Sequence, residues 1–129
     1  YGYICDTSFP TYLLTHWARD RIRGEKIPLE DLVKWQTQDT AATVGLNDRG
    51  QLKPGYKGDI NIIDFAKLKL HAPRIVNDLP AGGRRLGQSA EGYVATIVSG
   101  VVTYQHGVAT GALPGKLIRG AQKTQSVAA

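Results

Sequence analysis

The sequence predicts an α+β fold, in which helices precede a set of β-strands. In the first third of the chain, apolar residues such as Leu13, Leu14 and Trp17 recur at the spacing of one helix face. From Asp59 onward, β-branched residues occur in short runs bounded by charged or turn-forming residues, which is typical of strands. The 129 residues are 42% hydrophobic and 21% charged, so the chain can form a globular domain with a core.

Capping and stop signals divide the helical part into three predicted helices. Ser8 can cap the first helix, with Pro10 in its first turn, and Gly24 ends it. The second helix begins near Pro28, and Thr37 is expected to cap a short third helix over residues 38–44. As inner-face or core residues of these helices we expect Leu13, Leu14, Trp17, Ala18, Ile22, Leu29, Leu32, Val33 and Trp35.

Residues 45–65, GLNDRGQLKPGYKGDINIIDF, form the segment around which the rest of the chain is organised. Residues 48–50 suit a turn, with an Asp that can bond its own backbone and a Gly that can take positive φ. Residues 54–55 are Pro-Gly, the pair that a type II turn prefers. Residues 59–65 then have the pattern of a mostly buried strand. The predicted order is helix end, turn, turn, strand.

Two further strands are predicted over residues 93–98 and 101–105. Residues 99–100, Ser-Gly, join them as in a tight hairpin. Because these are the strongest strand patterns in the chain, we expect the hairpin to share a sheet with the strand that follows the Pro-Gly turn. Residues 66–92 are rich in Pro and Gly and are expected to form a long loop. Residues 122–129 are expected to be a disordered tail.

The organising segment closely resembles the point at which metal-dependent amidohydrolases leave their catalytic barrel and return to a small β domain. The pattern there is roughly G-L-x-D-R-G-x-L-x-P-G-x-x-A-D, followed by an apolar strand and Asp. The chain matches it at Gly45, Leu46, Asp48, Arg49, Gly50, Leu52, Pro54, Gly55, Asp59 and Asp64. It departs from the pattern at Gly58, where Ala is usual. Within the superfamily, the chain resembles the N-acyl-D-amino-acid deacylases, or D-aminoacylases, from about Tyr3 to Gly120.

This resemblance implies that the chain is the C-terminal part of a longer enzyme. Residues 1–45 would be the last helices of a (β/α)8 barrel, and residues 46–121 would be part of a small, composite β-sandwich domain. The enzyme would be a zinc-dependent hydrolase of a C–N bond other than a peptide bond, in an N-acyl amino acid or a related amide. Enzymes of this branch hold zinc with His-x-His, a Cys or acidic ligand and two later histidines. Their catalytic Asp lies in a motif resembling S-D-x-G-A-H.

None of these ligand patterns occurs in the chain. His16, His71 and His106 are far apart in sequence, and Cys5 is the single cysteine. A zinc site needs three or four ligands that converge on the ion. We therefore expect no catalytic residue and no zinc in this chain by itself, and the catalytic Asp of the resemblance would precede Tyr1. The chain alone should be inert.

Three residues are candidates for contact with a substrate, namely Asp6, Arg84 and Arg85. Asp6 is either a general base or a structural Asp on an active-site loop, and we favour the structural role. Arg84 and Arg85 follow a glycine-containing run and suit bidentate binding of a substrate carboxylate. For each arginine taken singly, a solvated position on a surface loop is the favoured alternative.

Composition and charge narrow the function further. The net charge of +5 comes from basic residues that are scattered and not interleaved with aromatic residues, so we expect no nucleic-acid binding. No uninterrupted apolar run reaches about 18 residues, so we expect no membrane span. A single cysteine excludes an internal disulfide framework and indicates a cytoplasmic protein.

An alternative function is a non-catalytic binding or assembly module, made of the β domain and the last helices. Whichever function holds, apolar helix residues such as Leu13, Trp17 and Val33 would face a barrel in the resemblance and lack that cover in this chain. Contiguous apolar patches of this kind are rare on monomers. We therefore expect a homo-oligomer.

Overall fold

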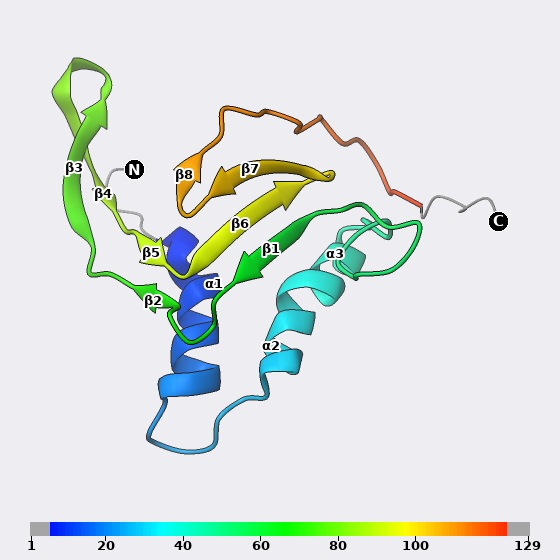
Figure 1. Ribbon diagram of the computed structural model, residues 1–129, viewed down its shortest axis with the longest axis horizontal. Coiled ribbons are helices and arrows are strands. Elements are labelled where there is room, and N and C mark those ends of the chain that lie inside the picture. Colours follow the sequence, from blue (N-terminus) through cyan, green and yellow to red (C-terminus); the bar gives the residue numbers. More distant parts are fainter. Residues whose placement is uncertain (1–5, 124–129) are drawn as a thin grey trace.

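The computed structural model describes residues 6–123 and shows a layer of helices beside a layer of strands (Figure 1). The helices form two runs packed against each other. The strands form a four-stranded sheet and two separate two-stranded pairs. This mixture confirms the predicted α+β class. The division near residue 45 and the origin of the helices in a barrel stay predictions.

The first helical run ends earlier than the sequence suggested. It consists of η1 (Asp6–Ser8), α1 (Phe9–Tyr12) and the π-helical η2 (Leu13–Asp20). Helix α1 begins after Ser8 with Pro10 in its first turn, as predicted, but the Oγ of Ser8 makes no cap bond and donates a 2.7 Å hydrogen bond to Oε1 of Gln88. Arg21 already has an extended backbone, so the helix does not reach Gly24. Ile22 is consequently 99% exposed and is not a core residue.

The second helical run is continuous where a break was predicted. It consists of α2 (Leu29–Lys34), the π-helical η3 (Trp35–Asp39) and α3 (Thr40–Thr43). Thr37 does not cap a new helix, since its Oγ1 donates 2.7 Å to the carbonyl oxygen of Val33, four residues earlier, as a hydroxyl inside a helix does. Leu32 is fully buried as expected, whereas Val33 and Trp35 are exposed and lie outside the core.

The main sheet brings the three predicted strands together. Its antiparallel strands, in spatial order, are β1 (Ile60–Ile63), β6 (Tyr93–Val98), β7 (Val101–Gln105) and β8 (Val108–Ala109). The prediction that the hairpin and the earlier strand share one sheet is confirmed. Ser99 and Gly100 both have positive φ, as a two-residue hairpin turn of the primed type requires. The short strand β8 was not predicted.

The prediction of a long loop over residues 66–92 is wrong. The segment contains β2 (Lys69–Leu70), β3 (Arg74–Leu79), η4 (Pro80–Gly82), β4 (Gly83–Gly87) and β5 (Ala90–Glu91). Strands β3 and β4 pair into a ribbon that projects away from the helices and the main sheet (Figure 1), and β2 pairs with β5 at its base. Pro80 and Gly82 lie at the tip of the ribbon, so residues interpreted as loop signals mark a turn between two strands.

The core is small. Among the described residues, the fully buried large apolar side chains are Leu32, on a helix, and Leu68, just before β2. The end of the described chain returns to the organising segment, where Gln122 pairs with Leu46 in a parallel bridge. Gln122 therefore does not belong to a disordered tail, and residues 124–129 lie outside the described part. No helix within residues 6–123 is long and apolar enough to cross a membrane.

Gln36 gives the second helical run a buried polar group without a partner. Its Nε2 atom is buried and has no hydrogen bond within the described chain. We expect Gln36→Met to raise the free energy of unfolding by about 1 kcal/mol, because the unpaired donor would be removed. Urea denaturation measures this change. The control Gln105→Met replaces an exposed amide on β7 and should change little, and a clear loss of stability in Gln36→Met would contradict the prediction.

Candidate functional site

A buried carboxylate connects the end of the helices with the sheet. Asp48 is 3% exposed, and Nε of Arg49 lies 3.0 Å from its Oδ1. The Arg49 Nη1 also donates 2.9 Å to Oδ2 of Asp59, just ahead of β1. The other oxygen of Asp59 accepts a 2.8 Å hydrogen bond from the backbone N–H of Ser99, in the β6–β7 turn. We call Asp48, Arg49 and Asp59 the junction cluster.

Charge and hydrogen bonding stabilise the ionised form of Asp48. The hydrogen bond from Arg49, with the positive charges of Arg49 and Lys57, holds the pKa of the Asp48 carboxyl below its ordinary value, although burial opposes this shift. The same partner raises the pKa of Arg49. Both carboxylates of the cluster are occupied by protein donors, so the cluster fixes the helix–sheet junction and leaves no group positioned for acid–base chemistry.

A second arginine ties the first helical run to the segment after β1. Arg19 donates to the backbone carbonyl oxygens of Phe65 and Leu68, the latter at 2.8 Å. Its Nε also lies 2.7 Å from Oδ1 of Asp20, and this hydrogen bond lowers the pKa of the Asp20 carboxyl. The contacts of Arg19 reach residues more than 40 positions away, and no local pattern could have indicated them.

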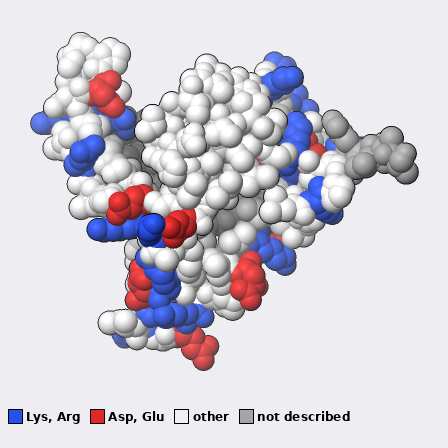
Figure 2. Space-filling model, viewed as in Figure 1, with Lys and Arg blue, Asp and Glu red and all other residues white. Residues whose placement is uncertain are grey.

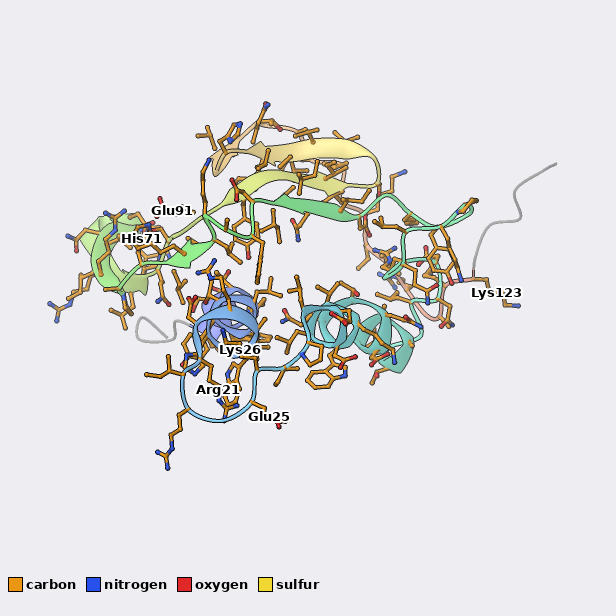
Figure 3. All side chains as sticks on the ribbon, turned by 60° about the horizontal axis from the view of Figure 1, so that its bottom comes forward. Arg21, Glu25, Lys26, His71, Glu91 and Lys123 are labelled. Carbon is orange, nitrogen blue, oxygen red and sulfur yellow. The ribbon has the colours of Figure 1, made fainter. Side chains whose placement is uncertain are left out.

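A groove of about 820 Å³ lies between η2 and the β2–β5 pair. Its acidic and basic residues come in ion pairs, which are Arg19–Asp20 at 2.7 Å, Lys67–Asp64 at 3.3 Å and Lys69–Glu91 at 4.0 Å. Glu91 also lies 3.7 Å from Nε2 of His71, and Figure 3 shows these two side chains near each other. The three cationic and three anionic side chains of these pairs compensate one another, and His106, which also lines the groove, belongs to none of the pairs.

Zinc, which the resemblance implies, finds no ligand set here. Within residues 6–123, no group of three His, Cys, Asp or Glu side chains is arranged to hold a metal ion. His16 stacks on Tyr12, with ring centroids 4.9 Å apart, and packs edge-on against Trp17. His106 lies in the turn between β7 and β8. The described residues therefore do not fit a zinc site.

The structure separates the three candidate substrate contacts. Asp6 is exposed in η1, at the start of the first helical run. Arg84 and Arg85 are neighbours in β4, so their side chains point to opposite faces of the ribbon. Arg85 donates two hydrogen bonds, of 2.8 and 2.6 Å, to the carboxylate of Asp78, which lowers the pKa of that carboxyl. Arg84 is exposed and forms no ion pair within the described chain.

Comparison with known proteins defines the family. A model described as "Amidohydrolase family" matches residues 2–104, from the first helical run through most of β7. The chain belongs to the amidohydrolase family. A dihydroorotase of Lactobacillus acidophilus (strain ATCC 700396 / NCK56 / N2 / NCFM) is 31% identical over 107 residues, which cover 79% of this chain and 23% of the dihydroorotase. This amidohydrolase-family chain thus spans about a quarter of that relative. No solved structure matches it.

The match confirms the resemblance read from residues 45–65 at the level of the amidohydrolase family. The narrower assignment to the N-acyl-D-amino-acid deacylases goes beyond what the match shows. The junction cluster lies inside the matched residues, and the Asp-Arg-Gly turn of the pattern supplies Asp48 and Arg49. The sequence predicted this turn but not the ion pairs that Arg49 forms with Asp48 and Asp59. The acidic residue at position 59, ten positions after Arg49, was the one sign of the second pair.

Proposed function

We propose that this chain is the C-terminal part of an amidohydrolase that cleaves a C–N bond other than a peptide bond. The observation that carries the proposal is the family match over residues 2–104. The span of about a quarter of a curated relative supports a longer parent enzyme. In this proposal the two helical runs belong to the end of a (β/α)8 barrel, and the main sheet belongs to a small β-sandwich domain.

The proposed substrate is an N-acyl amino acid, as in the N-acyl-D-amino-acid deacylases. Support comes from the resemblance to that branch, which runs from about Tyr3 to Gly120. Zinc is the proposed cofactor of the parent enzyme, with ligands from residues other than 6–123, because the described residues offer no ligand set. The described residues act as a scaffold, in which the junction cluster holds the last helix against the sheet.

Arg84 is the described residue best suited to meet a substrate carboxylate. Arg85 is held by Asp78, whereas the Arg84 guanidinium is exposed and has no ion-pair partner in the described chain. A guanidinium can bind a carboxylate with two parallel hydrogen bonds. We therefore assign carboxylate binding to Arg84 and a structural role to Arg85. Asp6 keeps its structural assignment.

Dihydroorotase activity is the second candidate, because the curated relative carries that name. This activity would also be hydrolysis of a C–N bond other than a peptide bond, so the two candidates differ in their substrate. A non-catalytic assembly module is the remaining alternative, and it predicts no turnover of either substrate.

An expression experiment separates these proposals. The 129-residue chain and the product of the complete reading frame that contains it are purified with zinc in the medium. Both are assayed for release of amino acids from N-acetyl-D- and N-acetyl-L-amino acids, and for hydrolysis of dihydroorotate. We expect amino-acid release by the longer product and none by the 129-residue chain. Turnover of dihydroorotate alone would favour the second candidate, and a reading frame that adds no metal ligands would contradict both enzymatic proposals.

Arg84→Gln in the longer product tests the carboxylate contact. Loss of one charge-assisted contact of about 1.5–3 kcal/mol raises KM by roughly tenfold or more. The matched control is Arg23→Gln, another exposed arginine, in the segment between the two helical runs. Equal KM values for the Arg84 variant and the wild type would remove Arg84 from the substrate site.

A further inference from the structure

One face of the first helical run meets the β segments through polar side chains. Its members recur at steps of three and four residues, and they are Ser8, Thr11, Thr15 and Arg19. The hydroxyl oxygens of Thr11 and Tyr93, at the start of β6, form a 2.7 Å hydrogen bond, and Arg19 donates to two carbonyl oxygens after β1. Hydrogen bonds need defined distances and angles, whereas apolar contacts are non-directional. This face therefore specifies how the helix lies on the β layer.

Gln88 connects this polar face to the ribbon of β3 and β4. It follows β4 directly, and its Oε1 accepts the 2.7 Å hydrogen bond from the Oγ of Ser8. Its Nε2 donates 2.7 Å to the carbonyl oxygen of His71, in the segment between β2 and β3. The backbone N–H of His71 also donates 3.0 Å to the carbonyl oxygen of Ser89. A single amide thus joins both strands of the ribbon, at their base, to the first helical run.

The position of Arg84 depends on this base. Arg84 lies four residues before Gln88, which is about 13 Å along an extended strand. A rotation of about 10° at the base would move Arg84 by about 2 Å, whereas a binding group has to be held within about 0.5 Å. Further out, Asp78 accepts two hydrogen bonds from Arg85 across the ribbon. The two strands therefore move together, and a rotation at the base reaches Arg84.

The charge of the ribbon suits an anionic group. Residues 74–87 contain three arginines and one acidic residue, Asp78, and Figure 2 shows basic and acidic side chains along the ribbon. This leaves an excess of two positive charges on the segment that carries Arg84. The field of such a segment attracts a carboxylate, but the contact itself requires that the guanidinium is held in place.

We propose that Gln88 positions Arg84 for the substrate carboxylate, by fixing the angle between the ribbon and the first helical run. This inference rests on the proposed function, which assigns the carboxylate contact to Arg84. Both polar ends of the Gln88 amide bind groups of the protein. Gln88 is therefore a positioning residue that acts through Arg84 and does not touch the substrate.

The kinetic test uses the longer product of the reading frame and the N-acetyl-amino acid that it hydrolyses fastest. Gln88→Leu removes both hydrogen bonds of the amide at nearly constant size. We expect KM to rise about three- to tenfold and kcat to change less than about twofold, because the contact with the substrate is weakened and the reacting groups are untouched. In the Arg84→Gln background the same change should raise KM no further, since the residue that Gln88 positions is gone.

Gln105→Leu is the matched control, because it replaces an exposed amide on β7, and it should leave KM unchanged. Ser8→Ala removes the hydrogen bond to the helical run and keeps the bond to His71. It should give a smaller rise in KM, and it replaces the Leu variant if that variant does not fold. An unchanged KM in the Gln88 and Ser8 variants would overturn the proposal. So would an equal rise with and without Arg84, because Gln88 would then act independently of it.

A distance measurement on the 129-residue chain tests the anchor without any enzymatic activity. Spin labels are attached through Glu30→Cys, at an exposed position of α2, and Ala81→Cys, at the tip of the ribbon, with Cys5→Ser to remove the native thiol. We expect the distance distribution to become about twice as wide when Gln88→Leu is added. Equal widths with and without Gln88→Leu would overturn the proposal, even in an active enzyme. If the longer product hydrolyses no N-acyl amino acid, the proposed function fails, and a widened distribution would still support the anchoring of the ribbon by Gln88.

Discussion

Replacing Gly50 with Ala is expected to lower the free energy of unfolding by about 3 kcal/mol, from a left-handed backbone and a close contact together. Gly50 has φ of +82°, where a side chain is strained. A Cβ atom there would lie 2.8 Å from the carbonyl oxygen of Thr37 and 3.0 Å from Cα of Gln38. Both atoms are backbone atoms of the second helical run, so they cannot move aside as a side chain could. Urea denaturation measures the loss.

Gly82→Ala is the matched control for this variant. Gly82 also has positive φ, at +72°, but no atom lies within 4 Å of the position of its added Cβ. Only the conformational strain remains, which is about 1 kcal/mol. The difference between the two variants therefore measures the close approach of the organising segment to the helix. Equal losses would mean that this contact is not important for stability.

Local turn chemistry explains which parts of the fold could be predicted. The Asp-Arg-Gly turn, the Pro-Gly turn and the Ser-Gly hairpin each specify their backbone within a few residues, and β1, β6 and β7 follow from them. The ribbon of β3 and β4 could not be predicted in the same way. Its strands contain Asn, Asp and Arg and are mostly exposed, so they lack the apolar alternation that identifies a strand.

The predicted side-chain caps failed for a different reason. Ser8 and Thr37 are residues that favour caps, but each has another hydrogen-bond acceptor, Gln88 for Ser8 and the Val33 carbonyl for Thr37. The acceptor of Ser8 lies 80 positions away in sequence. Contacts over such distances decide between a cap and a tertiary hydrogen bond, and a single sequence does not reveal them.

The junction cluster has a part that the sequence could predict, the local turn, and a part that it could not, the long-range contacts. The sequence predicted the turn at Asp48 but not the contacts that its neighbour Arg49 makes with Asp59 and that Asp59 makes with Ser99. These partners belong to different elements of the fold. Arg49 links Asp48 to Asp59, and Asp59 links to the hairpin turn. The candidate substrate residues were chosen without such information, and the structure distinguishes between Arg84 and Arg85 only through the position of Asp78.

Asp48→Asn is expected to lower the free energy of unfolding by about 2–3 kcal/mol at neutral pH, because it leaves a partly buried guanidinium with a single carboxylate. The Arg49 side chain is 18% exposed, and Asp59 would be its remaining partner. Asn keeps the shape of the side chain, so the change isolates the charge. Chemical denaturation at pH 7 measures the loss.

The control is Asp78→Asn, which removes the carboxylate from the pair with Arg85. That pair is short, at 2.6 Å, but both side chains are about half exposed. Exposed ion pairs contribute little to stability, so the Asp78 variant should remain close to the wild type. A loss as large as that of Asp48→Asn would show that geometry outweighs burial in this chain.

The pH dependence tests whether the charge of Asp48 is responsible. Arg49 lowers the pKa of Asp48 in the folded chain, so the stabilisation is fully present above the unfolded-state pKa of about 4. It is lost as the pH falls through the lower folded-state pKa. A protonated Asp then resembles Asn, and the stability difference between wild type and Asp48→Asn should shrink as the pH falls below about 4. If the stability difference between wild type and Asp48→Asn stayed constant from pH 7 to well below the pKa of Asp48, the effect would come from hydrogen-bond geometry and not from charge.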